Sequence, residues 1–165
     1  MKRAKSSVPI TPELKDFLEG GVSLVIGTRD AELVPEITRA WGLVVSKDRK
    51  SISLCVPLAT SQRALDNLAG SEQMTVCCCH PASYRTIQLK GQWIDRADPG
   101  LRDLAAVERH REAFASANER IGLPRPSIET FWRRELESSP SLVKLRFIPQ
   151  QIFDQTPGPG AGSPL

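Results

Sequence analysis

The stretch that decides the fold spans residues 34–68 and reads VPEITRAWGLVVSKDRKSISLCVPLATSQRALDNL. Its pattern predicts a strand over 34–46, a tight turn at KDRK and a second strand over 51–58. In the second strand every other residue is apolar, which is typical of a strand with one buried face. A short helix is predicted to begin at Ser61.

Arg39 has an unusual place in the first of these strands. Side chains of a strand alternate between its two faces, so Arg39 shares one face with four apolar residues, Ile37, Trp41, Leu43 and Val45. We expect this face to point inward. A buried guanidinium is costly unless an anion accompanies it, so its partner is either a core carboxylate such as Glu36 or Asp154, or a bound ligand.

The predicted helix start supplies a second basic group. Ser61 is placed at the first position of the helix and Arg63 in its first turn. The N–H groups and partial positive charge of a helix N-terminus suit a phosphate. Ser61 could equally be only a helix cap, and Arg63 only a solvated arginine. Together with Arg39 they predict a pocket for a phosphorylated cofactor.

The rest of the chain predicts further strands and peripheral helices. Leu101, Leu104, Val107, Phe114 and Ile121 have the spacing of one helical face. His110, in the same helix, is expected to be exposed or partly exposed. The predicted strands are 22–29, 72–79, 84–96 and 142–153, and the predicted helices are 12–19, 61–68, one that begins at 101, and 127–136. This order favours a mainly β (α+β) fold, a six-stranded antiparallel barrel with peripheral helices, over a parallel sheet.

Composition narrows the class of protein. The chain has 165 residues, 40% of them hydrophobic and 25% charged, with a formal net charge of +3. That charge is too small to indicate nucleic-acid binding, and the strands do not interleave aromatic and basic residues. The sequence has no membrane span and no signal peptide, so we expect a cytoplasmic protein with no membrane partner.

The run Cys77-Cys78-Cys79-His80 is the one apparent metal motif. In a strand Cys77 and Cys79 point to one face while Cys78 and His80 point to the other, so one ion could not collect all four. Zinc sites generally use spaced pairs of cysteines. We therefore expect no metal site, and small-hydrophobe packing for these cysteines.

Four segments together resemble the pyridoxamine 5′-phosphate oxidase-like flavin-binding split barrels. They are VSLVIGTRDAELVPEITRAWGL, PLATSQRALDNL, YRTIQLKG and FDQTPGPGAG. The resemblance covers nearly the whole chain and implies a split-barrel domain over 1–154, followed by a Gly/Pro-rich tail over 155–165.

The resemblance implies an FMN-binding homodimer with the cofactor at the subunit interface. Arg39 matches the phosphate-binding position of the second strand, and Ser61 and Arg63 match the hydroxyl and basic positions of the helix-opening loop. The main chain near Trp41 and Cys55 would run along the flavin ring. The cofactor-binding residues implied in this way are Arg39, Trp41, Gly42, Leu43, Cys55, Val56, Ser61, Gln62, Arg63, Thr86 and Gln88.

The chain also departs from the family. Arg63 stands where the true oxidases usually carry lysine, and it supplies a forked cation instead. The sequence TPGPGAGSPL replaces the terminal strand that binds pyridoxal in those enzymes, so the vitamin B6 substrate does not carry over. The resemblance implies an oxidoreductase acting on a small molecule, and no side chain stands out as its catalytic acid or base.

Three alternatives remain open from the sequence. A haem-binding or haem-degrading barrel would need an axial ligand, which only His80 or His110 could supply. Other members of the superfamily use the deazaflavin F420. A non-catalytic flavin-binding or stress-response protein would keep the barrel without turnover. If neither residue contacts a cofactor, Trp41 is a plain core residue and Gln88 faces solvent. For the tail, the alternatives are disorder and closure over the cofactor or the dimer partner.

Overall fold

The computed structural model describes residues 7–137 and 141–165; the first ten of its eleven elements follow the order expected from the sequence, and the last, a short strand in the tail, was not predicted. The six predicted strands lie within two residues of their predicted limits. The elements are α1 (Pro12–Leu18), β1 (Ser23–Arg29), β2 (Pro35–Val45), β3 (Ile52–Pro57), α2 (Leu58–Ser71), β4 (Gln73–Cys79), β5 (Thr86–Ala97), α3 (Leu101–Glu119), α4 (Arg125–Glu137), β6 (Leu142–Asp154) and β7 (Ser163–Pro164).

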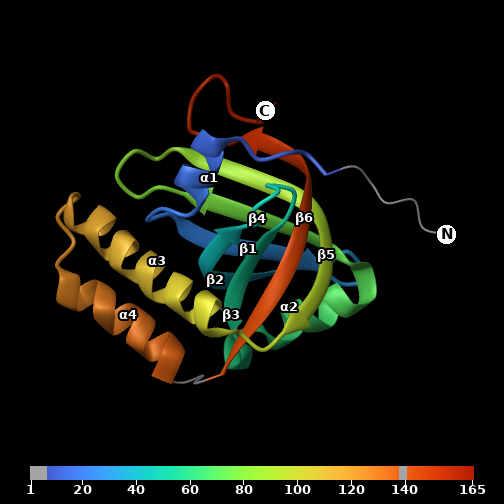
Figure 1. Cartoon of the computed structure of the whole chain (residues 1–165), viewed down its shortest axis with the longest axis horizontal. Coiled ribbons are helices and arrows are strands. Elements are labelled where there is room, and N and C mark those ends of the chain that lie inside the picture. The colour runs from blue at the N-terminus through green and yellow to red at the C-terminus, as the bar shows by residue number, and fades with distance from the viewer. Residues whose placement is uncertain (1–6, 138–140) are drawn as a thin grey trace.

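Six antiparallel strands form a closed barrel, as predicted (Figure 1). The strand order is β3-β2-β1-β4-β5-β6, and pairing of β3 with β6 closes it. Sequential strands joined by short turns pair as hairpins, which explains why β1 lies beside β2 and β4 beside β5. Closure leaves no long exposed edge in the barrel itself.

The barrel interior is the main hydrophobic core. Strands contribute every second residue, and Ile52, Leu54 and Val56 of β3 all point inward as expected. Helices α1 and α2 cover separate ends of the barrel, where Leu18 of α1 and Leu68 of α2 are fully buried in the same core (Figure 1).

Arg39 was expected to point into the barrel with the apolar residues of β2, and this expectation is wrong. Ile37 is 70% exposed and Arg39 is only partly buried, whereas Ala40 belongs to the core. A β-bulge separates the pairs Trp41–Cys55 and Val44–Ser53, so that β2 advances three residues while β3 advances two. The bulge exchanges the two faces. Residues beyond it, Leu43 and Val45, point into the barrel, whereas Arg39 and Trp41 point outward.

Gly42 makes this bulge possible. Its φ of +64° lies in the left-handed region, which favours glycine. A Cβ at this position would meet the backbone nitrogen of Val107 at 2.6 Å. The bulge therefore also lets α3 approach β2 closely.

Helices α3 and α4 pack together on the outside of the barrel (Figure 1). They cover Trp41 and form a second buried cluster, whose members are Trp41, Cys55, Val107, Phe114, Ala115, Ile128 and Trp132. The predicted apolar face of α3 is only partly correct. Val107 and Phe114 are buried, but Leu101 is 87% exposed and Leu104 and Ile121 are also exposed. His110 is buried instead, which corrects the expectation that it is exposed.

The Gly/Pro-rich tail is ordered, contrary to the expectation that it lacks regular structure. Strand β7 pairs with β6, with Ser163 opposite Asp154. Gly162 donates a backbone hydrogen bond to Asp154 at 2.7 Å. Backbone pairing with an existing strand thus holds the tail without a helix or a long strand. No helix within the described residues is long and apolar enough to cross a membrane.

Candidate functional site

Two of the predicted cofactor residues share one row on the outer face of the sheet. Arg39 of β2 lies opposite Val25 of β1, Val25 opposite Cys77 of β4, and Cys77 opposite Gln88 of β5. Directly opposite residues of neighbouring strands point to the same face. Arg39 and Gln88 are therefore separated by three strand spacings, about 14 Å along the sheet.

Val25, Cys77 and Gln88 of this row belong to a surface that we call the open face. It consists of alternating outward, uncharged residues of three strands, and the charged Arg39 of β2 and Lys90 of β5 border it, opposite Val25 and Thr75. Among the described residues, no helix packs broadly against β4 or β5. The members of the open face are Ser23, Val25, Gly27, Thr75, Cys77, Cys79, Thr86 and Gln88, and all are partly buried in the single chain.

Thr86 and Gln88 are held in place by the tail. The amide nitrogen of Thr86 donates to the hydroxyl oxygen of Thr156 at 3.1 Å, and the side-chain amide of Gln155 donates to Oε1 of Gln88 at 3.3 Å. The Thr86 hydroxyl donates to the carbonyl oxygen of Tyr84 at 2.9 Å. The segment 155–156 therefore positions both predicted ring contacts, which the sequence did not indicate.

Ser61 does not cap a helix, which corrects the predicted helix start. Helix α2 begins three residues earlier, at Leu58, and its N-cap is Pro57, which has no side-chain capping bond. Ser61 is buried in the second turn, where its hydroxyl shares a 2.8 Å hydrogen bond with Thr38. The two hydroxyls join α2 to β2, so Ser61 already has a structural role.

Arg63 and Gln62 lie on the exposed side of α2. The side chain of Arg63 is 74% exposed and forms a 3.3 Å ion pair with Glu36 of β2. Gln62 donates to Asp66, one turn further along the helix, at 2.9 Å. Glu36, considered as a partner for Arg39, thus pairs with Arg63 instead.

The remaining predicted residues are covered. Trp41 and Cys55 lie in the cluster beneath α3, and Leu43 and Val56 lie in the barrel core. The backbone N–H of Gly42 is also engaged, because it donates to Nδ1 of His110 at 3.1 Å. The structure therefore separates these five residues from the row that carries Arg39 and Gln88.

His110 is the residue that sequence reasoning missed. Because Nδ1 accepts from Gly42, Nε2 carries the hydrogen and donates it to the carbonyl oxygen of Val22 at 2.6 Å. Burial lowers the pKa of His110, the hydrogen bond to Val22 opposes this, and the charge of Arg39 lowers it further. Both ring nitrogens are thus used to join α3 to β1 and β2. The spacing of Val107, His110 and Phe114 placed all three on one helical face and was the available signal.

The four cysteines divide as the alternation predicts. Cys78 is fully buried in the barrel core, and burial raises its pKa. Cys77 and Cys79 lie on the open face. Partial burial is the larger cause that raises the pKa of Cys77, and the charge of Cys79 raises it further. Within the described residues, no group of three or more His, Cys, Asp or Glu side chains could hold a metal ion.

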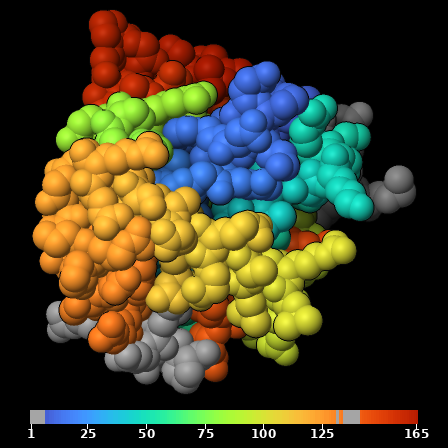
Figure 2. Space-filling view, turned by 60° about the vertical axis from the view of Figure 1, so that its left-hand side comes forward, coloured from blue at the N-terminus to red at the C-terminus, as the bar shows by residue number. Residues whose placement is uncertain are grey.

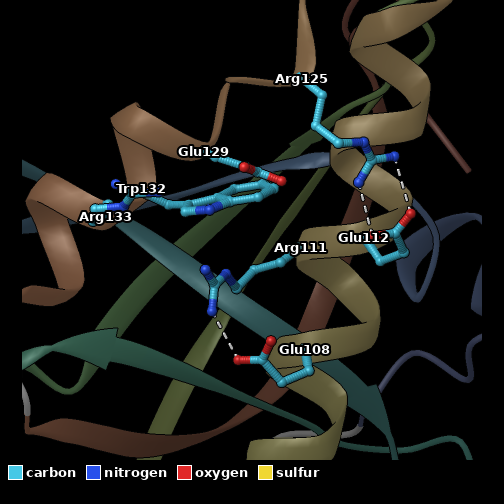
Figure 3. Close-up of a pocket in the computed structure, with 7 residues that line it drawn as sticks. All are labelled: Glu108, Arg111, Glu112, Arg125, Glu129, Trp132 and Arg133. Carbon is cyan, nitrogen blue, oxygen red and sulfur yellow. Dashed lines mark hydrogen bonds and ion pairs between the residues drawn. The ribbon is translucent and has the colours of Figure 1, made fainter. Parts of the chain in front are cut away.

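A charged cavity of about 490 Å³ lies between α3 and α4 (Figure 3). Its charges pair with one another. Arg125 binds Glu112 and Arg111 binds Glu108, each at 2.8 Å, and the Arg111 guanidinium lies 4.9 Å from the centre of the Trp132 ring. None of the predicted cofactor residues lines this cavity, so it is separate from the open face.

Comparisons with known proteins identify the fold. No protein-family model matches the chain, and no curated protein matches its sequence. Solved structures do match it. An F420 reductase aligns with a TM-score of 0.57 and 12% identity over 86% of this chain and 98% of that one. An FMN-binding protein from Syntrophomonas wolfei aligns with a TM-score of 0.50 and 12% identity over 85% of this chain and 82% of that one. HutZ, a haem storage protein from Vibrio cholerae, aligns with a TM-score of 0.50 and 17% identity over 89% of this chain and 95% of that one.

These structures share one architecture with the chain. The protein has the split-barrel fold of the pyridoxamine 5′-phosphate oxidase-like proteins, as the sequence resemblance implied. At such low identity the likeness defines the fold, and the cofactor has to be argued from the residues of this chain.

Proposed function

We propose that the protein is an FMN-binding flavoprotein, and that it acts as an oxidoreductase on a small molecule. The observation that carries the proposal is the row that places Arg39 and Gln88 on one outer face of a split barrel. Bound flavin would supply the electron-transfer chemistry, and the chain would supply binding and orientation.

The residues on the open face fit the chemical parts of FMN. The cationic Arg39 suits a phosphate, with which it can form forked hydrogen bonds. Val25 and Cys77, next in the row, are small and uncharged, as a flat ring system requires. Gln88 and Thr86 offer amide and hydroxyl groups for the polar edge of the ring. A span of about 14 Å between Arg39 and Gln88 matches a ligand that joins a ring to a phosphate through an extended chain.

The same face supports the proposal of a homodimer. A twofold axis places the same patch of two copies in contact, so like charges in such a patch would meet and repel. The members of the open face are uncharged, the charged Arg39 and Lys90 lie at its borders, and no described helix packs broadly against its β4 and β5 portions. We propose that two copies pair through this face, with the cofactor held between them along the row from Arg39 to Gln88.

Haem is the less favoured cofactor on structural grounds. An axial histidine needs a free ring nitrogen. Both ring nitrogens of His110 are hydrogen-bonded inside the protein, so ligation there would detach α3 from the barrel. His80 accepts a 3.3 Å hydrogen bond from Ser83 through Nδ1 and remains as the haem alternative. F420 shares a flat ring and a phosphate with FMN, and the open face does not discriminate between them.

Titration of the purified protein with FMN, F420 and haemin, followed by fluorescence and absorbance, tests the proposal. We expect saturable FMN binding with a changed flavin spectrum. Binding of haemin or F420 without any response to FMN would contradict the assignment.

Variants then test the phosphate site. Losing one charge-assisted bond costs about 1.5–3 kcal/mol, so Arg39→Gln should raise the Kd for FMN roughly 10- to 150-fold. Arg63→Gln should have a smaller effect, because Arg63 is exposed and paired with Glu36. Arg120→Gln, at the exposed end of α3, is the matched control. Equal affinity in the parent and Arg39→Gln would place the phosphate elsewhere.

A further inference from the structure

Helix α4 is the outermost layer on its side of the molecule. Among the described elements it packs broadly only against α3, and it lies on the side of α3 that faces away from the barrel (Figure 1). In Figure 2 the two helices, yellow to orange, form one exposed side of the molecule. Of the described side chains of α4, only Ile128 and Trp132 are buried. Few apolar contacts therefore hold α4 to the rest of the chain, which is typical of segments that open locally.

The interface between α3 and α4 is hollow and charged. Protein interiors are close-packed, yet these two helices leave a cavity of about 490 Å³ between them (Figure 3). Arg111 of α3 reaches across to the ring of Trp132, and its Nε is buried without a hydrogen-bond partner among the described residues. A buried donor without a partner costs free energy, and water would satisfy this donor if α4 moved away. The packing of α4 on α3 is thus weaker than that of the barrel core.

Arg125 joins the start of α4 to α3. Its guanidinium donates to both carboxylate oxygens of Glu112, at 2.8 and 3.0 Å, and to both of Glu119, at 3.1 and 2.8 Å. The Arg125 side chain is 31% exposed, so salt in the solvent can screen these contacts. The turn before it contains Gly122, whose φ is +89° and around which a Cβ would meet nothing within 4 Å. A loop of this kind between two helices suits a hinge.

The aromatic side chains beneath α4 adjoin the proposed phosphate site. The ring of Trp132 lies edge-on to that of Trp41, with centres 5.9 Å apart, and 6.5 Å from that of Phe114. Trp41 follows Arg39 by two residues on the outward side of β2, so their Cα atoms are about 7 Å apart. Trp41 is only 1% exposed beneath the helices. Moving Trp132 away would therefore continue the outer surface from Arg39 onto an aromatic wall.

We propose that α4 is a hinged cover, closed by the contacts of Arg125, that controls access from Arg39 to Trp41. The helix moves about the turn at 120–124, while α3 stays on the barrel through the two hydrogen bonds of His110. The inference goes beyond the proposed function, because the cover needs no flavin. When closed, it confines a ligand at Arg39 to the row along the sheet. When open, it admits an aromatic or apolar group beside the guanidinium.

A thiol introduced beneath α4 measures the opening. Ile128→Cys places a thiol on the buried side of α4, and Ala115→Cys places one on α3 in the same cluster while leaving α4 unchanged. Cys78, enclosed in the barrel core, reports global unfolding in the same molecule. Maleimide labelling followed by mass spectrometry gives both rates. Their ratio cancels changes in overall stability, because global unfolding exposes both thiols together.

We expect the introduced thiol to react about tenfold or more faster than Cys78 in both variants. Adding Arg125→Gln should raise the ratio about threefold or more, the size expected for partly exposed ion pairs. Arg146→Gln is the matched control, because it removes an exposed arginine that pairs with Asp95 on the barrel, and it should leave the ratio unchanged. Sodium chloride at about 1 M, where the screening length is about 3 Å, should raise the ratio only while Arg125 is present.

The labelling rates decide the proposal. Equal rates for the introduced thiol and Cys78 would mean that α4 leaves only when the whole chain unfolds, and would overturn the cover. A fast thiol that Arg125→Gln does not accelerate, or that Arg146→Gln accelerates equally, would overturn the closing role of Arg125. None of these measurements uses FMN, so the FMN titration judges the proposed function separately.

Discussion

His110→Phe is the change whose effect on stability follows most directly from the structure. Phenylalanine keeps an aromatic ring near Trp41, whose ring centre lies 5.5 Å from that of His110. It removes both hydrogen bonds, so the N–H of Gly42 and the carbonyl of Val22 stay buried without a partner. Each such loss costs about 1–3 kcal/mol, and we expect a total of roughly 2–6 kcal/mol. That is a large fraction of the 5–15 kcal/mol (roughly) by which domains are stable.

Urea unfolding followed by tryptophan fluorescence measures this loss, since Trp41 lies against both His110 and Trp132. We expect the unfolding midpoint to fall while the dependence on urea stays the same. His110→Gln is the matched variant, because its amide oxygen can accept from Gly42 and its amide nitrogen can donate to Val22. It should recover part of the stability. If the free energy of unfolding of His110→Phe lies within about 0.5 kcal/mol of the parent, the two His110 hydrogen bonds do not stabilise the fold, since surface changes have effects of that size.

The pH dependence gives an independent check on His110. Burial lowers its pKa in the folded state below the ordinary value of 6.5, so the unfolded chain binds the proton more readily. The stabilisation is complete above pH 6.5 and is lost as the pH falls toward the folded-state pKa. The stability difference between the parent and His110→Gln should therefore shrink below pH 6.5. A difference that stays constant from pH 8 to the onset of acid unfolding would contradict a buried neutral imidazole.

Two further predictions concern the bulge and the thiols. Gly42→Ala should destabilise the protein by about 1–3 kcal/mol in urea unfolding, because its Cβ would overlap the Val107 nitrogen and its φ is left-handed; an unchanged midpoint would mean that α3 does not approach β2 closely. Maleimide should leave Cys78 and Cys55 unlabelled until unfolding, since burial raises the pKa of Cys55 to about 12 and encloses Cys78; Cys79 should react first where the open face is free of a second copy, and mass spectrometry that finds Cys78 labelled as fast as Cys79 would contradict the alternation of β4.

The sequence by itself determined the architecture of this protein. Residues such as Ile52, Leu54 and Val56 alternate, and alternation reports a half-buried strand wherever the chain folds. The short turns between β1 and β2, β2 and β3, and β4 and β5 then require antiparallel hairpins, and the six strands together close a barrel. The inward place of Cys78 follows from the same periodicity. These features depend on local periodicity and short connections, which are visible without a structure.

The tertiary structure alone decided which face each part of the site occupies. A single extra residue at the Gly42 bulge turns Arg39 outward, and α3 packs closely against this bulge at Val107, 65 residues further along the sequence. The burial of His110, the bond from Ser61 to Thr38 and the anchoring of the tail on Thr86 likewise join segments that are distant along the chain. The sequence around a residue predicts the strand or helix in which it lies. It does not predict the residue's contact partner, because that partner is brought to it only when the whole chain has folded.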